Sequence, residues 1–323
     1  MYTPEAKLKA VRSRVRRWYA RHGRDLPWRR TRDPYAILVS EFMLQQTQVL
    51  RVLPAYTRFL ERFPTLATLA GAPLADVLRA WSGLGYNRRA RALHLAARHC
   101  GQGVPDDPAA LDALPGIGRY TAGAVACFAF GRDIAFADVN IRRTLGRIFI
   151  GRAASEREAI ALDASLLRSG SDAARWHHAL MDLGATVCTA RDPRCEVCPV
   201  GPLCAARHRR AEVARRRQPG FATSDRRVRG AIVRALAGAS NAMTLGSLSR
   251  IVGDAHVPRL VARLEAEGLV ETRGSRVRLP LDADSQAVAN GQDRRVERRV
   301  AHERGVEGAD GLGIPSAIVG SRA

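Results

Sequence analysis

Two carboxylates in this 323-residue sequence stand in surroundings that suit acid–base chemistry. Glu41 lies within the apolar stretch ILVSEFML, where a carboxylate must be paired or have a raised pKa. A raised pKa would make Glu41 a general acid. Asp138 precedes a predicted helix, whose N-terminus stabilises an anion, so it can face a developing cation. The alternatives are that Glu41 is an ordinary surface residue and that Asp138 is an ordinary helix cap. The scarcity of exposed positions around Glu41 disfavours the first.

A compact cysteine array follows the last predicted helix of the first region. Its C-x6-C-x2-C-x5-C pattern, interrupted by prolines, consists of Cys188, Cys195, Cys198 and Cys204. Zinc sites usually pair two short knuckles, and only one is present here. The spacing also differs from that of ferredoxins. The array therefore predicts a metal cage, whereas Cys100 and Cys127 lie on predicted helices and are expected to be core thiols.

A glycine turn precedes Asp138. The stretch LPGIG contains Leu114, Gly116 and Gly118, and its two glycines permit positive φ and close backbone approach. Residues 119–130 then predict a buried helix, whose N-terminal N–H groups suit a phosphate. An ordinary αα-hairpin would have the same turn.

The composition points to a polyanionic partner. The formal net charge is +21, and all but two of the 52 basic residues are Arg, the exceptions being Lys7 and Lys9. Compositional bias explains Arg in place of Lys, but not the excess over 31 acidic residues. The first 20 residues are charged, and no apolar run approaches the roughly 18–20 residues that span a bilayer. We expect a soluble cytoplasmic protein with no membrane contact.

Helical periodicity dominates the chain up to the cysteines. Residues 1–206 are expected to form one all-α region, with helices over 6–22, 35–44, 49–63, 73–81, 88–100, 119–130, 141–149, 155–168 and 172–184. Residues 207–224 are an Arg-rich linker. Residues 225–281 predict three helices and a hairpin that turns at Gly274, a winged-helix-like α+β module that either contacts DNA or packs on the main region. Residues 282–323 predict a disordered tail.

Several stretches together resemble the MutY-type adenine DNA glycosylases of the endonuclease III-like helix-hairpin-helix superfamily. They are LPWRR, SEFMLQQTQV, WSGLGY, LPGIGRYTAGA, DVNIRR, MDLGATVC and the four-cysteine array. The LQQTQ stretch that follows Glu41 is the most specific, because it separates this branch from relatives that act on pyrimidines. The resemblance implies a helix-hairpin-helix glycosylase fold over residues 1–206, closed by a loop that holds a [4Fe–4S] cluster. Zinc is the alternative metal.

The resemblance also implies a reaction. A base-excision-repair enzyme of this family hydrolyses the N-glycosidic bond of adenine mispaired with 8-oxoguanine or guanine in double-stranded DNA. The adenine is flipped out of the duplex, Glu41 protonates it, and Asp138 stabilises the oxocarbenium-like sugar. Tyr120 and Asn140 are implied to assist by hydrogen bonding. We expect a monomer associated with the nucleoid.

Further contacts follow from the resemblance alone. The adenine pocket is implied to be lined by Arg24, Trp28, Arg29 and Leu44. The base stack near the lesion is implied to be filled or wedged by Gln46, Leu84 and Tyr86, and the damaged guanine is implied to be contacted by Thr47. Tyr86 could pack on its own domain instead. The DNA backbone is implied to rest on the hairpin of Leu114, Gly116 and Gly118.

The sequence departs from the family at three places, one of which is Asn87, where a second aromatic residue commonly follows Tyr86. The family usually ends in a domain that resembles nucleotide pyrophosphohydrolases and reads 8-oxoguanine, and the winged-helix-like module replaces it here. His178 stands where a carboxylate or amide often faces the adenine, and a surface histidine is the preferred interpretation. The preference for 8-oxoguanine over guanine therefore does not follow from the sequence.

Two other functions stay open at this point. One is a glycosylase of the same superfamily that removes uracil or thymine from mismatches, and the other is a non-catalytic Fe–S DNA-binding protein. Binding alone would require neither Glu41 nor Asp138, which disfavours the second. Relatives that also cut the strand carry a lysine in the slot of Tyr120, where it forms a Schiff base. A phenol cannot do so, and the sequence predicts a monofunctional glycosylase without AP lyase activity.

Overall fold

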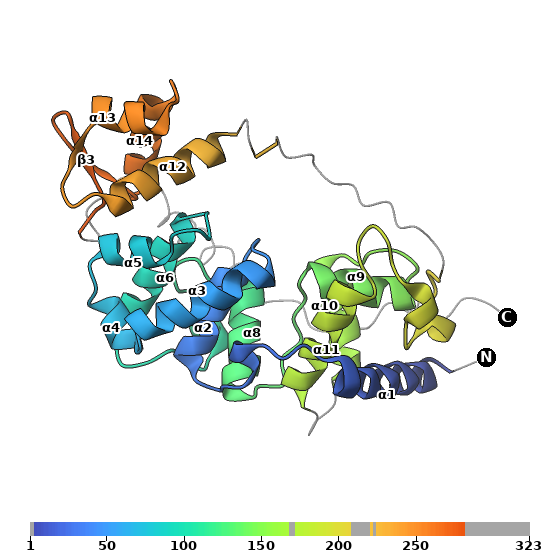
Figure 1. Ribbon diagram of the computed structural model, residues 1–323. Helices are drawn as coiled ribbons and strands as arrows, with labels where there is room; N and C mark the ends of the chain where they lie inside the picture. The colour runs from blue at the N-terminus through green and yellow to red at the C-terminus, as the bar shows by residue number, and fades with distance from the viewer. Residues whose placement is uncertain (1–2, 168–171, 208–219, 222–223, 282–323) are drawn as a thin grey trace, which may run out of the picture.

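A computed structural model describes residues 3–167, 172–207, 220–221 and 224–281. Its helices form two packed groups and a smaller third unit (Figure 1). The first group consists of α2 (Pro34–Leu44), α3 (Val49–Arg62), α4 (Leu66–Ala70), α5 (Leu74–Ala80), α6 (Arg88–His99), α7 (Pro108–Asp112) and α8 (Arg119–Phe130). The second consists of α1 (Pro4–His22), α9 (Val139–Phe149), α10 (Glu156–Leu166) and α11 (Ala173–Thr186). The predicted all-α architecture of this region is confirmed.

Helix α2 is the centre of the first group, because nearly all of its residues are apolar. Asp33 caps its N-terminus by accepting a hydrogen bond from the backbone N–H of Tyr35 (3.0 Å), and Pro34 occupies the first turn. Every residue from Tyr35 to Met43 is buried, and the helix packs against α3, α6 and α8. Glu41 is therefore held inside the helical layer and not on its surface.

The predicted glycine turn joins α7 to α8. Gly116 adopts φ +76°, and a Cβ atom there would lie 2.6 Å from Ala92 Cβ and 3.0 Å from a ring carbon of Phe42. The missing side chain thus lets the turn approach α2 and α6 closely. Gly118 caps α8 without any side-chain hydrogen bond, so no side chain occupies the N–H groups of that helix N-terminus.

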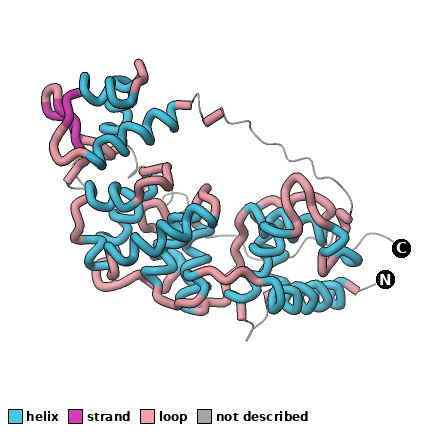
Figure 2. The backbone as a smooth tube through the Cα atoms, viewed as in Figure 1, coloured by secondary structure: helices cyan, strands magenta, loops and turns pink. Residues whose placement is uncertain are grey.

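The third unit lies against α5 and α6 (Figure 1). It consists of α12 (Asp225–Gly238), β1 (Met243–Thr244), α13 (Leu245–Val252), α14 (Val257–Ala266), β2 (Glu271–Arg273) and β3 (Arg276–Arg278). Within the described residues, strands occur only here (Figure 2). They form an antiparallel sheet of order β1-β3-β2, in which Val277 is the partner of both Met243 and Thr272. The predicted winged-helix-like module is confirmed.

The observed helices differ from the predicted ones mainly in length. Three elements are not predicted from the sequence, because they are too short to show a period: α4 and α7 have five residues each and β1 has two. The predicted linker and tail fall largely on residues 208–219 and 282–323, which lie outside the described residues, so the division into four segments stays a prediction. None of the described helices is long and apolar enough to cross a membrane.

The Gly116 turn generates a stability prediction. We expect Gly116→Ala to lower the free energy of unfolding by about 2 kcal/mol or more, since it combines a clash with a left-handed backbone. Gly118→Ala is the matched control, because nothing lies within 4 Å of its Cβ position and its φ is −122°. That variant should lower the free energy of unfolding by no more than about 1 kcal/mol, which is the cost of a weaker helix cap. Urea unfolding measures both, and equal losses would contradict the assigned close approach.

Candidate active site and cysteine cavity

Glu41 is a buried carboxyl group with a raised pKa. Its relative exposure is 6%, and burial raises its pKa from 4.5 to about 7. The negative charge of Asp138 raises this pKa further, whereas a hydrogen bond with Tyr120 and the charge of Arg29 lower it. Burial dominates, so a substantial fraction of Glu41 carries its proton near neutral pH. A carboxyl group in that state can donate a proton to a leaving group.

Asp138 is the N-cap of α9, and three N–H groups hold its carboxylate. Its Oδ1 atom accepts hydrogen bonds from the backbone of Asn140 (2.8 Å) and Ile141 (2.7 Å). Its Oδ2 atom accepts one from the Asn140 side chain (2.7 Å). These hydrogen bonds hold the carboxylate in one position at the positive end of the helix. The structure therefore fixes Asp138 close enough to Glu41 for its charge to affect the Glu41 carboxyl group.

Tyr120 interacts with Glu41 through a hydrogen bond and lies within electrostatic reach of Asp138. Burial, reinforced by the charges of Glu41 and Asp138, raises the pKa of its phenol well above the ordinary value, so Tyr120 remains a neutral hydrogen-bond donor. Its ring packs edge-on against Phe136 at 5.7 Å. Phe136 in turn stacks on His177, which contacts the buried Asp163 carboxylate at 2.7 Å. This support is not predicted from the sequence, because its members come from the segment before α9 and from two other helices, α10 and α11.

Asn140 is positioned by Arg143, a residue that the sequence analysis did not single out. The Arg143 guanidinium donates to the side-chain oxygen of Asn140 (2.7 Å) and to the backbone oxygen of Gly184 (2.7 Å). It also donates to the backbone oxygen of Cys188 (2.8 Å). One side chain thus connects the candidate active site to the start of the cysteine loop.

The predicted adenine pocket contains an ion-pair cluster. Asp182, buried on α11, accepts hydrogen bonds from the Arg29 guanidinium (2.8 Å) and from the backbone and side chain of Arg24 (2.8 and 2.7 Å). These interactions keep the pKa of Asp182 below its ordinary value although burial opposes them. Trp28 is buried edge-on against Tyr56 at 5.3 Å, and Leu44 is half-buried at the end of α2. The structure therefore brings Arg24 and Arg29 together through a carboxylate that was not predicted.

His178 is half-buried, and the preferred interpretation as a surface histidine is wrong. Its ring stacks on Phe128 with 4.3 Å between the centroids. Burial, reinforced by the charge of Arg29, lowers its pKa to about 3. His178 is therefore a neutral imidazole, which can both donate and accept a hydrogen bond.

Two loops carry the residues that the resemblance assigns to the base stack. Gln46 and Tyr86 are exposed and adopt φ values of 55° and 49°, in the left-handed region that bulky residues rarely adopt. Thr47 is half-buried. Leu84 differs from the expectation, because only 4% of it is exposed and it belongs to the core. In this structure Tyr86, which is 43% exposed, is the residue of its loop that could reach a base.

Arg89 joins these two loops, and the sequence analysis missed it. Its buried guanidinium donates to the backbone oxygens of Phe42 (2.9 Å) and Met43 (3.0 Å), at the C-terminus of α2. It also donates to the side chain of Thr47 (3.0 Å) and to the backbone oxygen of Gly85 (3.1 Å). Gln46 and Tyr86, which have unusual backbone conformations, lie next to the groups that Arg89 binds. The Arg89 hydrogen bonds therefore fix both loops relative to α2.

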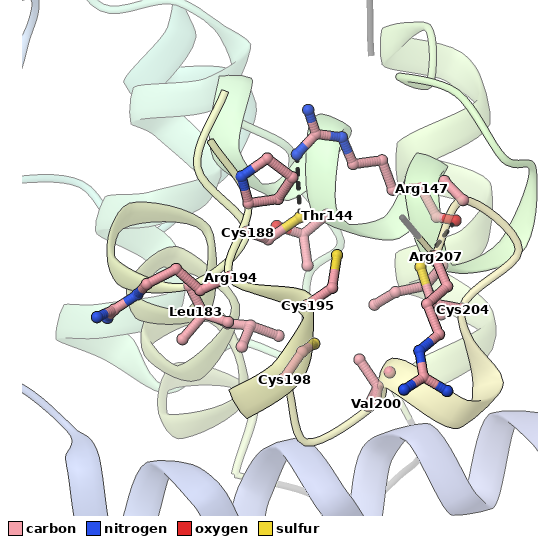
Figure 3. Close-up of a pocket in the computed structure, with 15 residues that line it drawn as sticks. Thr144, Arg147, Leu183, Cys188, Arg194, Cys195, Cys198, Val200, Cys204 and Arg207 are labelled. Carbon is pink, nitrogen blue, oxygen red and sulfur yellow. Dashed lines mark hydrogen bonds between the residues drawn. The ribbon is translucent and has the colours of Figure 1, made fainter. Parts of the chain in front are cut away.

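The four predicted metal ligands surround one cavity (Figure 3). Cys188, Cys195, Cys198 and Cys204 all line it, with apolar side chains and Arg147 beside them. Arg147 donates to Cys188 Sγ (3.4 Å), and Cys204 Sγ donates to the backbone oxygen of Arg147 (3.3 Å). In the described part of the chain no three potential ligands are grouped closely enough for a single metal ion. Of the other two thiols, Cys127 is buried and Cys100 is half-buried.

The burial of Glu41 generates a prediction about stability and pH. Its pKa is about 7 in the folded protein and ordinarily 4.5, so folding favours the protonated form. That stabilisation is complete below pH 4.5 and is lost as the pH rises to about 7, by roughly 3 kcal/mol in total. As the pH rises from 5 to 8, the free energy of unfolding should fall less in Glu41→Gln than in wild type, as measured by urea unfolding.

Glu158→Gln provides a contrast of opposite sign. Arg152 and Ser155 lower the pKa of Glu158 to about 2, so its contribution is present above pH 4.5 and is lost as the pH falls through about 2. At pH 8 this variant should therefore lose stability while Glu41→Gln gains it. Parallel pH profiles of wild type and Glu41→Gln would contradict the raised pKa.

Comparisons with known proteins agree with this geometry. Residues 39–168 match the model of the HhH-GPD superfamily of base excision DNA repair proteins. The adenine DNA glycosylase of Mycobacterium tuberculosis (strain H37Rv) is 42% identical over 278 residues, which cover 81% of this chain and 91% of that protein. That of Mycolicibacterium smegmatis is 44% identical over 268 residues, 79% of this chain and 90% of its own.

A solved structure shows the same fold. A thermostable thymine-DNA glycosylase superimposes with a TM-score of 0.58 at 31% identity, over 62% of this chain and 96% of its own. Since the mycobacterial relatives are matched over nearly their whole length, the chain belongs to the adenine DNA glycosylase family, within the HhH-GPD superfamily of base excision DNA repair proteins.

Proposed function

We propose that this DNA glycosylase removes adenine mispaired with 8-oxoguanine or guanine in double-stranded DNA. The observation that carries the proposal is the buried Glu41, with its raised pKa, within electrostatic reach of the Asp138 carboxylate and hydrogen-bonded to the neutral Tyr120. Adenine is a poor leaving group until a ring nitrogen is protonated, and a buried acid with a pKa of about 7 supplies that proton near neutral pH. The adenine-specific relatives, at 42–44% identity, support the choice of base.

The reaction follows from the charges of the site. Once a flipped adenine lies against Glu41, proton transfer weakens the C–N bond, and its cleavage leaves an oxocarbenium-like sugar. The Asp138 carboxylate, fixed by three N–H donors, stabilises this cation. Asn140 and Tyr120 keep the two carboxyl groups in place, and water completes the hydrolysis.

The surrounding residues suit recognition of a purine and its partner base. An ion-pair cluster near Glu41 presents polar groups, and it consists of Arg24, Arg29 and Asp182. The remaining contacts that the resemblance implies are apolar, namely Trp28 and Leu44. Gln46, Thr47 and Tyr86 contact the duplex at the site of the extruded base. We propose that the enzyme acts as a monomer on nucleoid DNA, which its positive charge attracts.

The cysteine cavity fits a [4Fe–4S] cluster. Four thiols line one cavity, and a cluster of this kind is held by four thiolates. Burial raises the pKa of Cys198 to about 11 and raises that of Cys204, and the other thiols of the cavity add to both effects, so the thiolates need a cationic centre. When bound, the cluster would supply a polynuclear iron centre that cross-links the loop. Arg147, which contacts the first cysteine and caps the loop carbonyls of Thr189 and Ala190, holds the loop on α9.

The excision reaction gives the direct test. Glu41→Gln should bind duplex DNA as wild type does and excise adenine roughly 10²–10⁴-fold more slowly, because an amide cannot donate the proton. Single-turnover assays should compare duplexes with A opposite 8-oxoguanine, A opposite G, and U or T opposite G. Excision of uracil or thymine in preference to adenine would favour the mismatch pyrimidine glycosylase, and no excision from any duplex would favour a binding protein.

The metal content tests the cluster. Cys198→Ser should lose iron and visible absorption, and should weaken the fold around the loop, because metal binding and loop folding are coupled. Cys100→Ser is the control, since Cys100 lies at the end of α6, outside the cavity. Stoichiometric zinc without iron in the wild-type protein would refute the cluster.

Strand cleavage is expected to be absent. The two lysines lie on α1, where Lys9 pairs with Glu5 (3.0 Å) and Lys7 donates to the backbone oxygen of Ile148 (3.2 Å). Neither is placed beside Asp138 as a Schiff base would require, and Arg cannot replace them because it stays protonated. Borohydride should trap no adduct at an internal residue during excision, and efficient trapping at Lys7 would contradict this expectation.

A further inference from the structure

The C-terminal module has the build of a helix-turn-helix with a wing. Helices α13 and α14 are joined by four residues, 253–256, that begin with Gly253 at φ +65°. Such a pair, with a short glycine-containing turn, is the DNA-binding helix-turn-helix arrangement, whose second helix enters the major groove. Helix α12 and the three-stranded sheet cover its other side, and the β2–β3 hairpin projects as the wing.

The second helix of this pair has a small, basic outer face. On α14 the inner positions are buried, namely Val257, Leu260, Val261 and Leu264. The outer positions are exposed, namely Pro258, Arg259, Ala262, Arg263 and Ala266. The acidic residues of this segment face elsewhere, because Glu265 accepts from the Thr272 backbone (2.8 Å) and Glu267 from Arg229 (2.8 Å). A face of alanines and arginines fits closely against phosphates.

The wing adds to the same charge. Its tip consists of Arg273, Gly274, Ser275 and Arg276, all exposed, with Gly274 at φ +59°. The glutamate of this hairpin, Glu271, is paired with Arg278 (2.8 Å) at the base and away from the tip. Helix α14 and the wing thus present arginines without an exposed acidic residue between them along the chain.

The module is fixed beside the loop that contacts the lesion. Leu74 donates its N–H to the backbone oxygen of Leu281 (3.1 Å), and Arg79 donates to that of Ala237 (3.2 Å), which joins α5 to the module. Arg226, in the first turn of α12, donates to the hydroxyl of Tyr86 (3.3 Å). Its neighbour Asp225 accepts from Arg259 (3.0 Å) on α14. Two consecutive residues at the start of α12 thus contact the Tyr86 loop and the outer face of α14.

We propose that α14 and the wing form a second DNA-binding surface, which holds the phosphate backbone of the duplex to one side of the lesion. This surface lies beyond α5 and α6, on the side away from the cysteine loop (Figure 1). The exposed pairs of Asp225 with Arg259 and Arg263 do not prevent this, since such pairs are weak in water and arginines can exchange to phosphate. The inference rests on the proposed function for the position of the lesion, whereas duplex binding can be measured without excision.

The test compares two pairs of substitutions in the full-length protein. Arg263→Ala with Arg273→Ala removes one arginine from α14 and one from the wing. Arg234→Ala with Arg250→Ala removes two exposed arginines of the same module, from α12 and α13. Affinity for an undamaged 30-base-pair duplex is measured by fluorescence anisotropy over a range of salt concentrations, and thermal melting checks that both variants fold.

The first pair should weaken binding about tenfold at moderate salt and reduce the slope of log K against log salt by about 1.8, for two lost phosphate contacts. The control pair should change affinity less than twofold and leave the slope unchanged. Equal losses in both pairs, or none in the first, would overturn the proposal. Absence of adenine excision by the wild-type protein would refute the proposed function but leave this result interpretable.

Position along the duplex gives a second readout. With a central A opposite 8-oxoguanine and Glu41→Gln as a slow background, removing base pairs from one side should weaken binding more than removing them from the other. Arg263→Ala with Arg273→Ala should abolish that asymmetry, whereas the control pair should retain it. An asymmetry that survives the first pair would overturn the assignment of these arginines.

Discussion

The structure depends on holding two carboxyl groups close together where water is scarce. Two anions in such a place would repel each other with little screening, and burial together with the charge of Asp138 raises the pKa of Glu41. The two groups differ in their surroundings. Asp138 receives three N–H groups at the start of α9, whereas Glu41 is buried on the apolar helix α2. The acid and the anion are thus distinguished by their surroundings and not by their residue types.

Paired polar groups between helices keep these surroundings in place. Arg143 connects α9 to the residues that begin the cysteine loop, and Asp182 connects α11 to Arg24 and Arg29 before α2. Breaking a buried pair leaves an uncompensated charge, which costs far more than the pair gains when intact. The helices that carry Glu41 and Asp138 therefore cannot shift independently, although the two residues belong to different helix groups.

The sequence predicted what is local and missed what is long-range. Neighbouring residues predict the apolar run around Glu41, the capping position of Asp138 and the glycine turn. Spacing alone predicts that the four cysteines share one site. Four buried or half-buried polar residues position the site through partners that lie 40 or more residues away or on another helix, and no periodicity shows such pairs. They are Asp182, Asp163, Arg89 and Arg143. The burial of Leu84 is not predicted for a similar reason, since its loop turns it inward onto the core.

The unusual backbone at Gln46 and Tyr86 has a consequence for the entropy of binding. Arg89 bridges the two segments, so their conformational freedom is already lost when the protein folds. A flexible loop that became ordered on contact with a partner would lose conformational entropy and weaken binding, and this cost is small for loops that are already fixed. The strain of the two left-handed residues is therefore borne by folding and not by binding.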